Sequence, residues 1–193
     1  MSDAGAGTRH ITDVEALSRH LENLDTRERV RSAVLTCCRG MDRGDLSLIL
    51  SAYHDDAVLR HGPFEGPAST FAAEWVRDRF PAFLSTSHRV ANVLIHDGVD
   101  EAFVESYVLG YIVTRAAPDR VTVFSGRYCD DFAKRNGIWA IARRTSLHDW
   151  SGVMAFAPES AGVPGRPFVQ GRRDRDDPSY EGVARLTTGR ASR

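Results

Sequence analysis

The sequence predicts an α+β domain in which helices lie on one face of a strongly bent antiparallel sheet. Three observations carry this prediction: helical spacing of apolar residues in the first half of the chain, consecutive strand-like segments between residues 87 and 150, and an Asn136-Gly137 pair near the end of that stretch. Helices followed by a run of strands are typical of the α+β class. Asn-Gly is a strong signal for a tight hairpin.

Three helices are expected before the four C-terminal strands, and a first short strand separates the second helix from the third. Residues 26–41 carry apolar side chains at helical spacing, with arginines on the opposite face. The stretch "DLSLILSAY" predicts a second, short helix capped by Asp45. Residues 67–80 return to helical spacing, with Pro67 at the start and aromatic residues such as Trp75 for packing.

Strands are expected where the period changes. The stretch "DDAVLRHGPFEG" predicts a short strand that ends in a Gly-Pro turn. Four further strands are predicted at residues 87–96, 102–115, 121–135 and 138–150. The last three are long enough to form a highly curved antiparallel meander.

The composition indicates one globular domain with additions at both ends. We expect an N-terminal extension at 1–24, partly disordered, a domain at 25–156, and a Gly/Pro/Arg-rich arm at 157–193. The net charge of −1 disfavours nucleic acid and acidic membranes as partners. The chain has neither a signal-like segment nor an apolar run of about 18 residues, so we expect a soluble cytoplasmic protein. The three cysteines lack disulfide or zinc spacing.

A family likeness rests on the stretches "CCRGMDRGDLSLILSAYHDDAVLRHGPFEG", "STSHRVANVLI" and "SGRYCDDFAKRNGIWAIARRTSLHDW" and on the order of the elements. Over roughly residues 25–152 the chain resembles the SnoaL-like group of the nuclear-transport-factor-2-like superfamily. Scytalone dehydratase, bile-acid 7α-dehydratase and hexachlorocyclohexane dehydrochlorinase are relatives in that superfamily. The resemblance implies a cone-shaped α+β barrel with helices across the concave face of the sheet.

The resemblance also implies a catalytic pair, because the aspartate and histidine of the catalytic relatives match Asp42 and His88. A carboxylate on one imidazole nitrogen fixes the tautomer and stabilises the imidazolium that forms when the other nitrogen takes a proton. Considered singly, Asp42 also fits a helix-end turn and His88 a hydrogen-bonded residue at the edge of the core. Together they predict a general base.

The acid partner of this base is less well defined by the sequence. His61 falls where dehydratase relatives place a pocket tyrosine, and it is either a proton donor or a turn histidine that faces solvent. Bile-acid and scytalone dehydratase-like sequences carry a tyrosine near the aspartate, where this chain has Cys37 and Cys38. The position of a further acid in the bile-acid enzyme matches about Gly110.

Other side chains are predicted to bind substrate. Tyr53 is a weaker candidate, since it also fits the core. Tyr107 and Tyr111 share one face of a strand, which lines the cone or forms the outer surface of the sheet. Arg127 suits an enolate or a carboxylate, or else a surface ion pair, and it points opposite to its neighbour Tyr128. His148 and Trp150 alternate onto one face and are expected to be a secondary polar group and a pocket wall.

These features predict a cofactor-free lyase or isomerase, dehydratase-like, acting on a hydrophobic polycyclic or aromatic small molecule. The alternative is a non-catalytic binding or accessory protein that resembles the small subunits of ring-hydroxylating dioxygenases. No metal site is predicted, because the histidines lack HxH or HExxH spacing. A homodimer or higher homo-oligomer is expected, formed sheet against sheet through Val104, Val108, Val121 and Val123.

Overall fold

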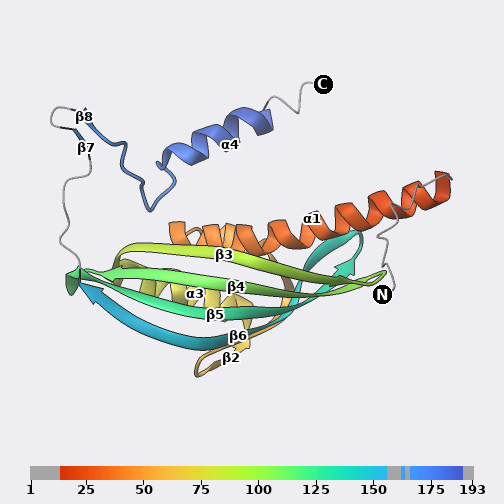
Figure 1. Ribbon diagram of the computed structural model, residues 1–193, viewed down its shortest axis with the longest axis horizontal. Helices are drawn as coiled ribbons and strands as arrows, with labels where there is room; N and C mark the ends of the chain where they lie inside the picture. The colour runs from red at the N-terminus through yellow and green to blue at the C-terminus, as the bar shows by residue number, and fades with distance from the viewer. Residues whose placement is uncertain (1–13, 156–161, 164–165, 189–193) are drawn as a thin grey trace, which may run out of the picture.

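A curved six-stranded sheet forms the body of the molecule, and one long helix crosses it (Figure 1). The computed structural model describes residues 14–155, 162–163 and 166–188. The helical segments are α1 (Val14–Arg43), α2 (Leu46–Leu50), α3 (Ala68–Glu74), the π-helical turn η1 (Trp75–Arg79), the 3-10 turn η2 (Phe80–Ala82) and α4 (Pro178–Thr188). The strands are β1 (Tyr53–His61), β2 (Phe64–Pro67), β3 (Phe83–Asp97), β4 (Glu101–Thr114), β5 (Ala117–Arg135), β6 (Ile138–Ala155), β7 (Gly162–Val163) and β8 (Arg166–Pro167).

The strand order is β2-β1-β6-β5-β4-β3, and β3 to β6 form the predicted antiparallel meander. The turn between β5 and β6 has positive φ at Asn136 and Gly137, as the Asn-Gly pair predicts. The α+β class and the bent sheet are confirmed. The sheet is mixed, however, because β1 runs parallel to β6, and it is not closed, since β2 and β3 are its two edges.

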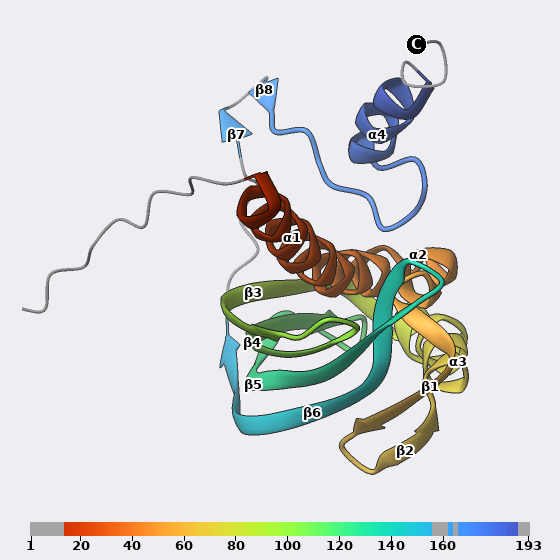
Figure 2. The same cartoon turned by 90° about the vertical axis from the view of Figure 1, so that its right-hand side faces the viewer.

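The helices cover one side of the sheet. In Figure 2 the strands curl from β6 round to β3, with α1 along β3 and α3 beside β1. Helix α2 begins at Asp45, whose carboxylate accepts a hydrogen bond from the backbone N–H of Leu48 at 3.3 Å, as expected of an N-cap. No helix within the described ranges is both long and apolar enough to cross a membrane.

Helix α1 is 30 residues long and begins well before the predicted residue 26. Residues 14–24 of the expected N-terminal extension are therefore its first turns, whereas residues 1–13 lie outside the described residues. The leucines of these turns, Leu17, Leu21 and Leu24, are exposed. This segment buries no apolar side chain. The spacing of apolar residues therefore could not predict that residues 14–24 continue the helix of the domain.

The core contains one buried ion pair in addition to its apolar residues. Arg144 on β6 and Asp130 on β5 are direct register partners, and two guanidinium nitrogens donate to the two carboxylate oxygens at 2.6 Å. The guanidinium also lies over the ring of Tyr128, at 4.1 Å, and donates to the sulfur of Cys37 on α1 at 3.4 Å. This cluster joins the helix to the centre of the sheet.

Two of the four valines predicted to form a sheet-against-sheet interface cannot do so, because Val104 and Val108 are buried in the hydrophobic core of the protomer. Val121 and Val123 on β5 lie outside that core cluster; Val121 is partly buried and Val123 is buried. The association of two copies stays a prediction. The exposed apolar side chains of the sheet are others, among them Phe103 and Trp150.

We expect Asp130→Asn to lower the free energy of unfolding by about 3–5 kcal/mol, because it leaves the guanidinium of Arg144 buried without its counter-charge. Urea denaturation followed by circular dichroism measures this change. Asp56→Asn is the matched control, since Asp56 forms an exposed pair with Arg135 and exposed pairs contribute little. Equal effects of the two substitutions would contradict the structural role given to the buried pair.

Candidate active site

Asp42 and His88 are in direct contact. Asp42 is the penultimate residue of α1, and one of its carboxylate oxygens lies 2.7 Å from Nδ1 of His88, while the other accepts the backbone N–H of His88 at 2.9 Å. The His88 side chain is 2% exposed and that of Asp42 is 13% exposed. A carboxylate at Nδ1 favours the tautomer that carries its proton there, which leaves the Nε2 lone pair free to accept a proton.

His88 forms part of the wall of a cavity of about 400 Å³, enclosed between the helices and β3 to β6. This volume lies within the range usual for small-molecule sites. Aromatic and aliphatic side chains form most of the wall, including Met41, Trp75, Phe83, Val108, Ile112 and Phe124. The lining residues with polar side chains are His61, Arg79, His88, Arg127, Tyr128, Ser146 and His148. We refer to this space as the cavity.

Aromatic rings fix the orientation of the His88 imidazole. The ring of Phe124 meets it edge-on, with centroids 6.0 Å apart, and Trp75 lies on another side at 6.3 Å. Trp75 is itself held by a hydrogen bond from its indole N–H to the carbonyl of Met41 at 3.1 Å. The imidazole is therefore positioned by packing as well as by Asp42.

Gly110 makes room for Phe124. A Cβ atom at this position would lie only 1.9 Å from the Phe124 ring, so any larger residue would displace that ring from the cavity wall. Phe124 thus fills the place at which the resemblance puts an acidic side chain in the bile-acid enzyme. The structure explains in this way why no acid can be accommodated here.

His61 lies across the cavity wall from β3, at the end of β1. Its Nδ1 is 2.9 Å from the hydroxyl oxygen of Ser146, and its ring packs on Phe71 with centroids 5.0 Å apart. Burial, assisted by the positive charge of Arg79, lowers the pKa of His61 from 6.5 to about 4. The ring is therefore neutral at pH 7 and acts as a hydrogen-bond donor or acceptor, not as a cationic acid.

Tyr128 and its neighbour Arg127 both border the cavity, but the guanidinium of Arg127 points away from it. The guanidinium of Arg127 pairs with Glu105 at 2.9 Å and with Asp149 at 3.6 Å, which is the surface ion pair that the sequence left open. Burial raises the pKa of the Tyr128 phenol well above its ordinary value. Tyr128 is therefore a neutral donor, and no hydrogen-bond partner of its hydroxyl is found among the described residues.

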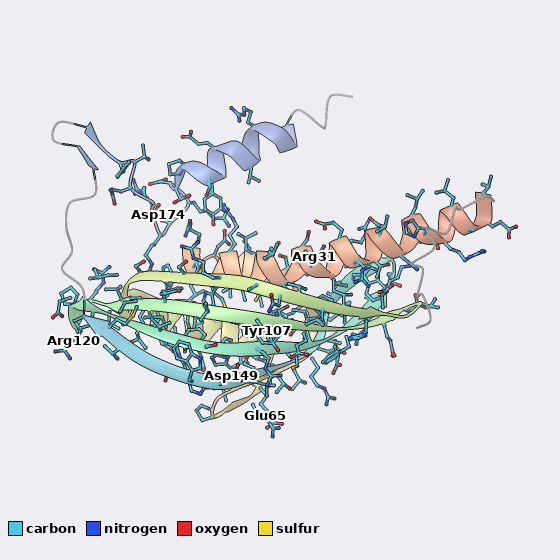
Figure 3. The ribbon with its side chains drawn as sticks, in the orientation of Figure 1. Arg31, Glu65, Tyr107, Arg120, Asp149 and Asp174 are labelled. Carbon is cyan, nitrogen blue, oxygen red and sulfur yellow. The ribbon has the colours of Figure 1, made fainter. Side chains whose placement is uncertain are left out.

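Three of the predicted tyrosine positions do not line the cavity. Tyr53 is partly buried and packs against the core, with its hydroxyl 3.6 Å from the sulfur of Cys37. Tyr107 is partly exposed, with the guanidinium of Arg127 5.9 Å from its ring. Figure 3 labels Tyr107 on β4 and Asp149 on β6, the two strands that flank β5. Tyr111 is half-buried but is not part of the cavity wall.

His148 lines the cavity, but Trp150 does not and is 53% exposed. Strict alternation predicts one face for both residues. The register shifts, however, between Ser125 and Gly126 of β5, which pair with Trp150 and His148, so that Asp149 is an extra residue in β6. A bulge of this kind re-aims side chains and cannot be recognised from alternation alone.

The C-terminal arm packs on the body beside the dyad formed by Asp42 and His88. Figure 1 shows its loop running toward the end of α1. Arg173 stacks on the Phe80 ring at 3.8 Å and donates to the carbonyl of Phe83, the first residue of β3. Arg175 and the Tyr180 hydroxyl bind the carboxylate of Asp45 at 3.1 and 3.0 Å. The arm therefore contacts both segments that carry the dyad, the end of α1 and the start of β3.

Comparison with known proteins identifies the family. The model of the SnoaL-like domain matches residues 22–145, well over half of the chain. The chain belongs to the SnoaL-like domain family. The arm lies beyond the matched residues, and no curated protein sequence matches the chain.

Solved structures show the same fold. The hexachlorocyclohexane dehydrochlorinase LinA type 2 is 18% identical, with a TM-score of 0.66 over 75% of this chain and 99% of its own. A candidate scytalone dehydratase from Novosphingobium aromaticivorans DSM 12444 is 20% identical, with a TM-score of 0.61 over 76% of this chain and 97% of its own. A candidate aromatic ring hydroxylase from Novosphingobium aromaticivorans is 18% identical, with a TM-score of 0.61 over 68% and 94%. The SnoaL-like chain thus has the nuclear-transport-factor-2-like fold.

Within the described part of the chain, no group of three or more His, Cys, Asp or Glu side chains is arranged to hold a metal ion. The polar groups at the cavity wall include His88 of the dyad, His61 with Ser146, Tyr128, His148 and Arg79. Such a site can accept a proton at one wall and donate hydrogen bonds from others.

The low pKa of His61 predicts that the free energy of unfolding falls as the pH drops from about 6.5 to about 4. In this range the imidazole is protonated in the unfolded chain but remains neutral in the native protein. The loss amounts to at most about 3.5 kcal/mol, at about 1.4 kcal/mol per pKa unit. Urea denaturation across this pH range measures it. His61→Phe should flatten the pH dependence, and His96→Ala, an exposed control on β3, should not. An unchanged slope in His61→Phe would refute the assignment.

The arm contacts predict that Arg173→Ala alters the environment of the His88 ring. We expect changed ¹⁵N resonances of its imidazole nitrogens, because the start of β3 loses its tie to the arm. Arg173→Lys should restore part of the native spectrum. Arg172→Ala is the control, since the Arg172 side chain pairs with Asp174 and Asp176 inside the arm. If Arg173→Ala lowered the melting temperature but left the His88 resonances in place, the arm would stabilise the fold without positioning the dyad.

Proposed function

We propose that this SnoaL-like protein is a cofactor-free lyase or isomerase that removes a carbon-bound proton from a hydrophobic polycyclic or aromatic small molecule. The observation that carries the proposal is the Asp42–His88 hydrogen bond in the wall of a mostly apolar cavity. A paired imidazole has no evident structural need for a cavity of about 400 Å³ beside its second nitrogen. A general base does need one.

In this mechanism the Nε2 atom of His88 takes the proton, and Asp42 stabilises the resulting imidazolium through Nδ1. The electron pair of the broken C–H bond then forms a carbon–carbon π bond. In an elimination, the leaving group departs with the electron pair of its own bond to carbon. In an isomerisation, the proton returns from His88 to another carbon of the same π system. General-base catalysis of this kind contributes about 10²–10⁴-fold.

His61, Ser146 and Tyr128 would serve the departing group or the oxygen of an enolate. All three are neutral at pH 7, so they stabilise negative charge by hydrogen bonding. With the Ser146 hydroxyl donating to Nδ1 of His61, the Nε2–H of His61 remains as a donor. This arrangement gives the proposed base a set of donors at another wall of the same cavity.

The named activities of the structural neighbours support the reaction class. One is a dehydrochlorinase and another is a candidate scytalone dehydratase, and both names describe eliminations. At 18% and 20% identity these neighbours share the fold, and the reaction proposed for this chain is argued from the dyad.

A second candidate function is that of a non-catalytic accessory subunit. Exposed apolar side chains at the end of β6, Trp150, Val153 and Met154, favour a protein partner there. A neighbour named as a candidate aromatic ring hydroxylase is consistent with this reading. An accessory subunit would not need the dyad, so His88→Ala would leave its function intact.

We expect His88→Ala to reduce turnover by about two to four orders of magnitude and Asp42→Asn nearly as much, since an amide cannot stabilise the imidazolium. The assay follows conjugated products by ultraviolet absorption over a panel of β-hydroxy ketones, chlorinated cycloalkanes and β,γ-unsaturated ketones. Tyr128→Phe and His61→Ala should cost less in isomerisation than in elimination, where a group must depart.

His96→Ala controls for the loss of an imidazole, since this exposed histidine lies on β3 away from the cavity. Near-normal turnover by folded His88→Ala would place the base elsewhere and end the proposal. Turnover lost equally in His96→Ala would show that the assay reports stability.

A further inference from the structure

Arg79 is a positively charged residue of the cavity wall that has no carboxylate partner among the described residues. Among the described residues that form its wall there is no aspartate or glutamate, and the two permanent cations are Arg79 and Arg127. Arg127 is neutralised by Glu105 and Asp149 on the outer face. Within the described part of the chain, no carboxylate pairs with Arg79.

The location of Arg79 places its charge at the entrance of the cavity. It is the last residue of the π-helical turn η1, four residues after Trp75, and its side chain is exposed. Its guanidinium carbon lies 6.0 Å from the centre of the Phe71 ring, and the same ring packs against His61 at 5.0 Å. Arg79 and His61 therefore border one aromatic side chain at one end of the cavity.

The charge of Arg79 also affects its neighbour. It contributes to the lowered pKa of His61, so this end of the cavity favours a negative group over a second positive one. At the rim of an apolar space, an arginine with free donors matches a planar anion, because its guanidinium forms paired hydrogen bonds with a carboxylate. Water screens this charge less at a cavity mouth than on a flat surface.

We propose that Arg79 binds a carboxylate of the substrate, so that the molecule turned over in the cavity is a hydrophobic acid. The inference rests on the proposed function, because it assumes that a small molecule occupies the cavity. The carboxylate would lie at the Arg79–His61 end, with the apolar body of the molecule against Trp75, Phe83 and Phe124. Arg79 then determines specificity, while His88 performs the chemistry.

The proposal is tested by comparing two probes of equal shape, 2-naphthoate and the neutral 2-naphthamide, by isothermal titration calorimetry and NMR shift mapping. The wild-type protein should bind the acid about tenfold more tightly than the amide, the effect expected of charge-assisted hydrogen bonding. Arg79→Gln should abolish this preference and leave amide binding unchanged. Added salt should weaken binding of the acid alone.

Arg77→Gln is the matched control, because Arg77 lies in the same turn, is exposed and is already paired with Asp78. It should keep the preference for the acid. Equal binding of acid and amide by the wild type, a preserved preference in Arg79→Gln, or no binding of either probe would each overturn the proposal. His88→Ala should keep the preference, so failure of the anion site and failure of the proposed catalysis give different results.

Discussion

The carboxylate of Asp42 is the constraint on which the site depends. It accepts hydrogen bonds from both the backbone N–H and the imidazole of His88, and so it joins the end of α1 to β3 at two points. The first bond fixes the strand and the second fixes the ring. Because both use one side chain, the helix cannot shift without moving the base, and the imidazole is oriented before any substrate arrives.

Two further features keep α1 where this bridge requires it. On the sheet side, the buried pair of Arg144 and Asp130 reaches Cys37 one turn before Asp42. On the outer side, Arg175 and Tyr180 of the arm donate hydrogen bonds to the carboxylate of Asp45, just after the helix ends. Buried ion pairs are seldom a net source of stability, but they penalise every arrangement in which the partners separate. Here they favour a single placement of the helix on the sheet.

The sequence was informative where one side chain performs one recognisable task. Asp45 as a cap and the Asn136-Gly137 turn follow from local patterns, whereas the pairing of Asp42 with His88 was implied by the family resemblance. Contacts that depend on register could not be foreseen. Asp130 and Arg144 each look like ordinary strand charges until β5 and β6 are paired. Likewise, aromatic residues at helical spacing, such as Trp75, predict packing, and only the fold shows that they pack around a cavity. The bulge between His148 and Trp150 cannot be recognised from the alternation of polar and apolar residues along the strand.

The distribution of charge in the cavity bears on which reactions it suits. The donors His61, Ser146 and Tyr128 are neutral at pH 7, so none supplies a strong acid for a poor leaving group. Phe124 occupies the space beside Gly110, where any side chain on residue 110 would collide with its ring. Reactions whose leaving group departs as a stable anion, or in which nothing departs, therefore demand least of this site. A substrate carboxylate held by Arg79 would also set how far the C–H bond lies from His88. The separation between Arg79 and His88 would then select substrates by the distance between their carboxylate and the carbon that loses its proton.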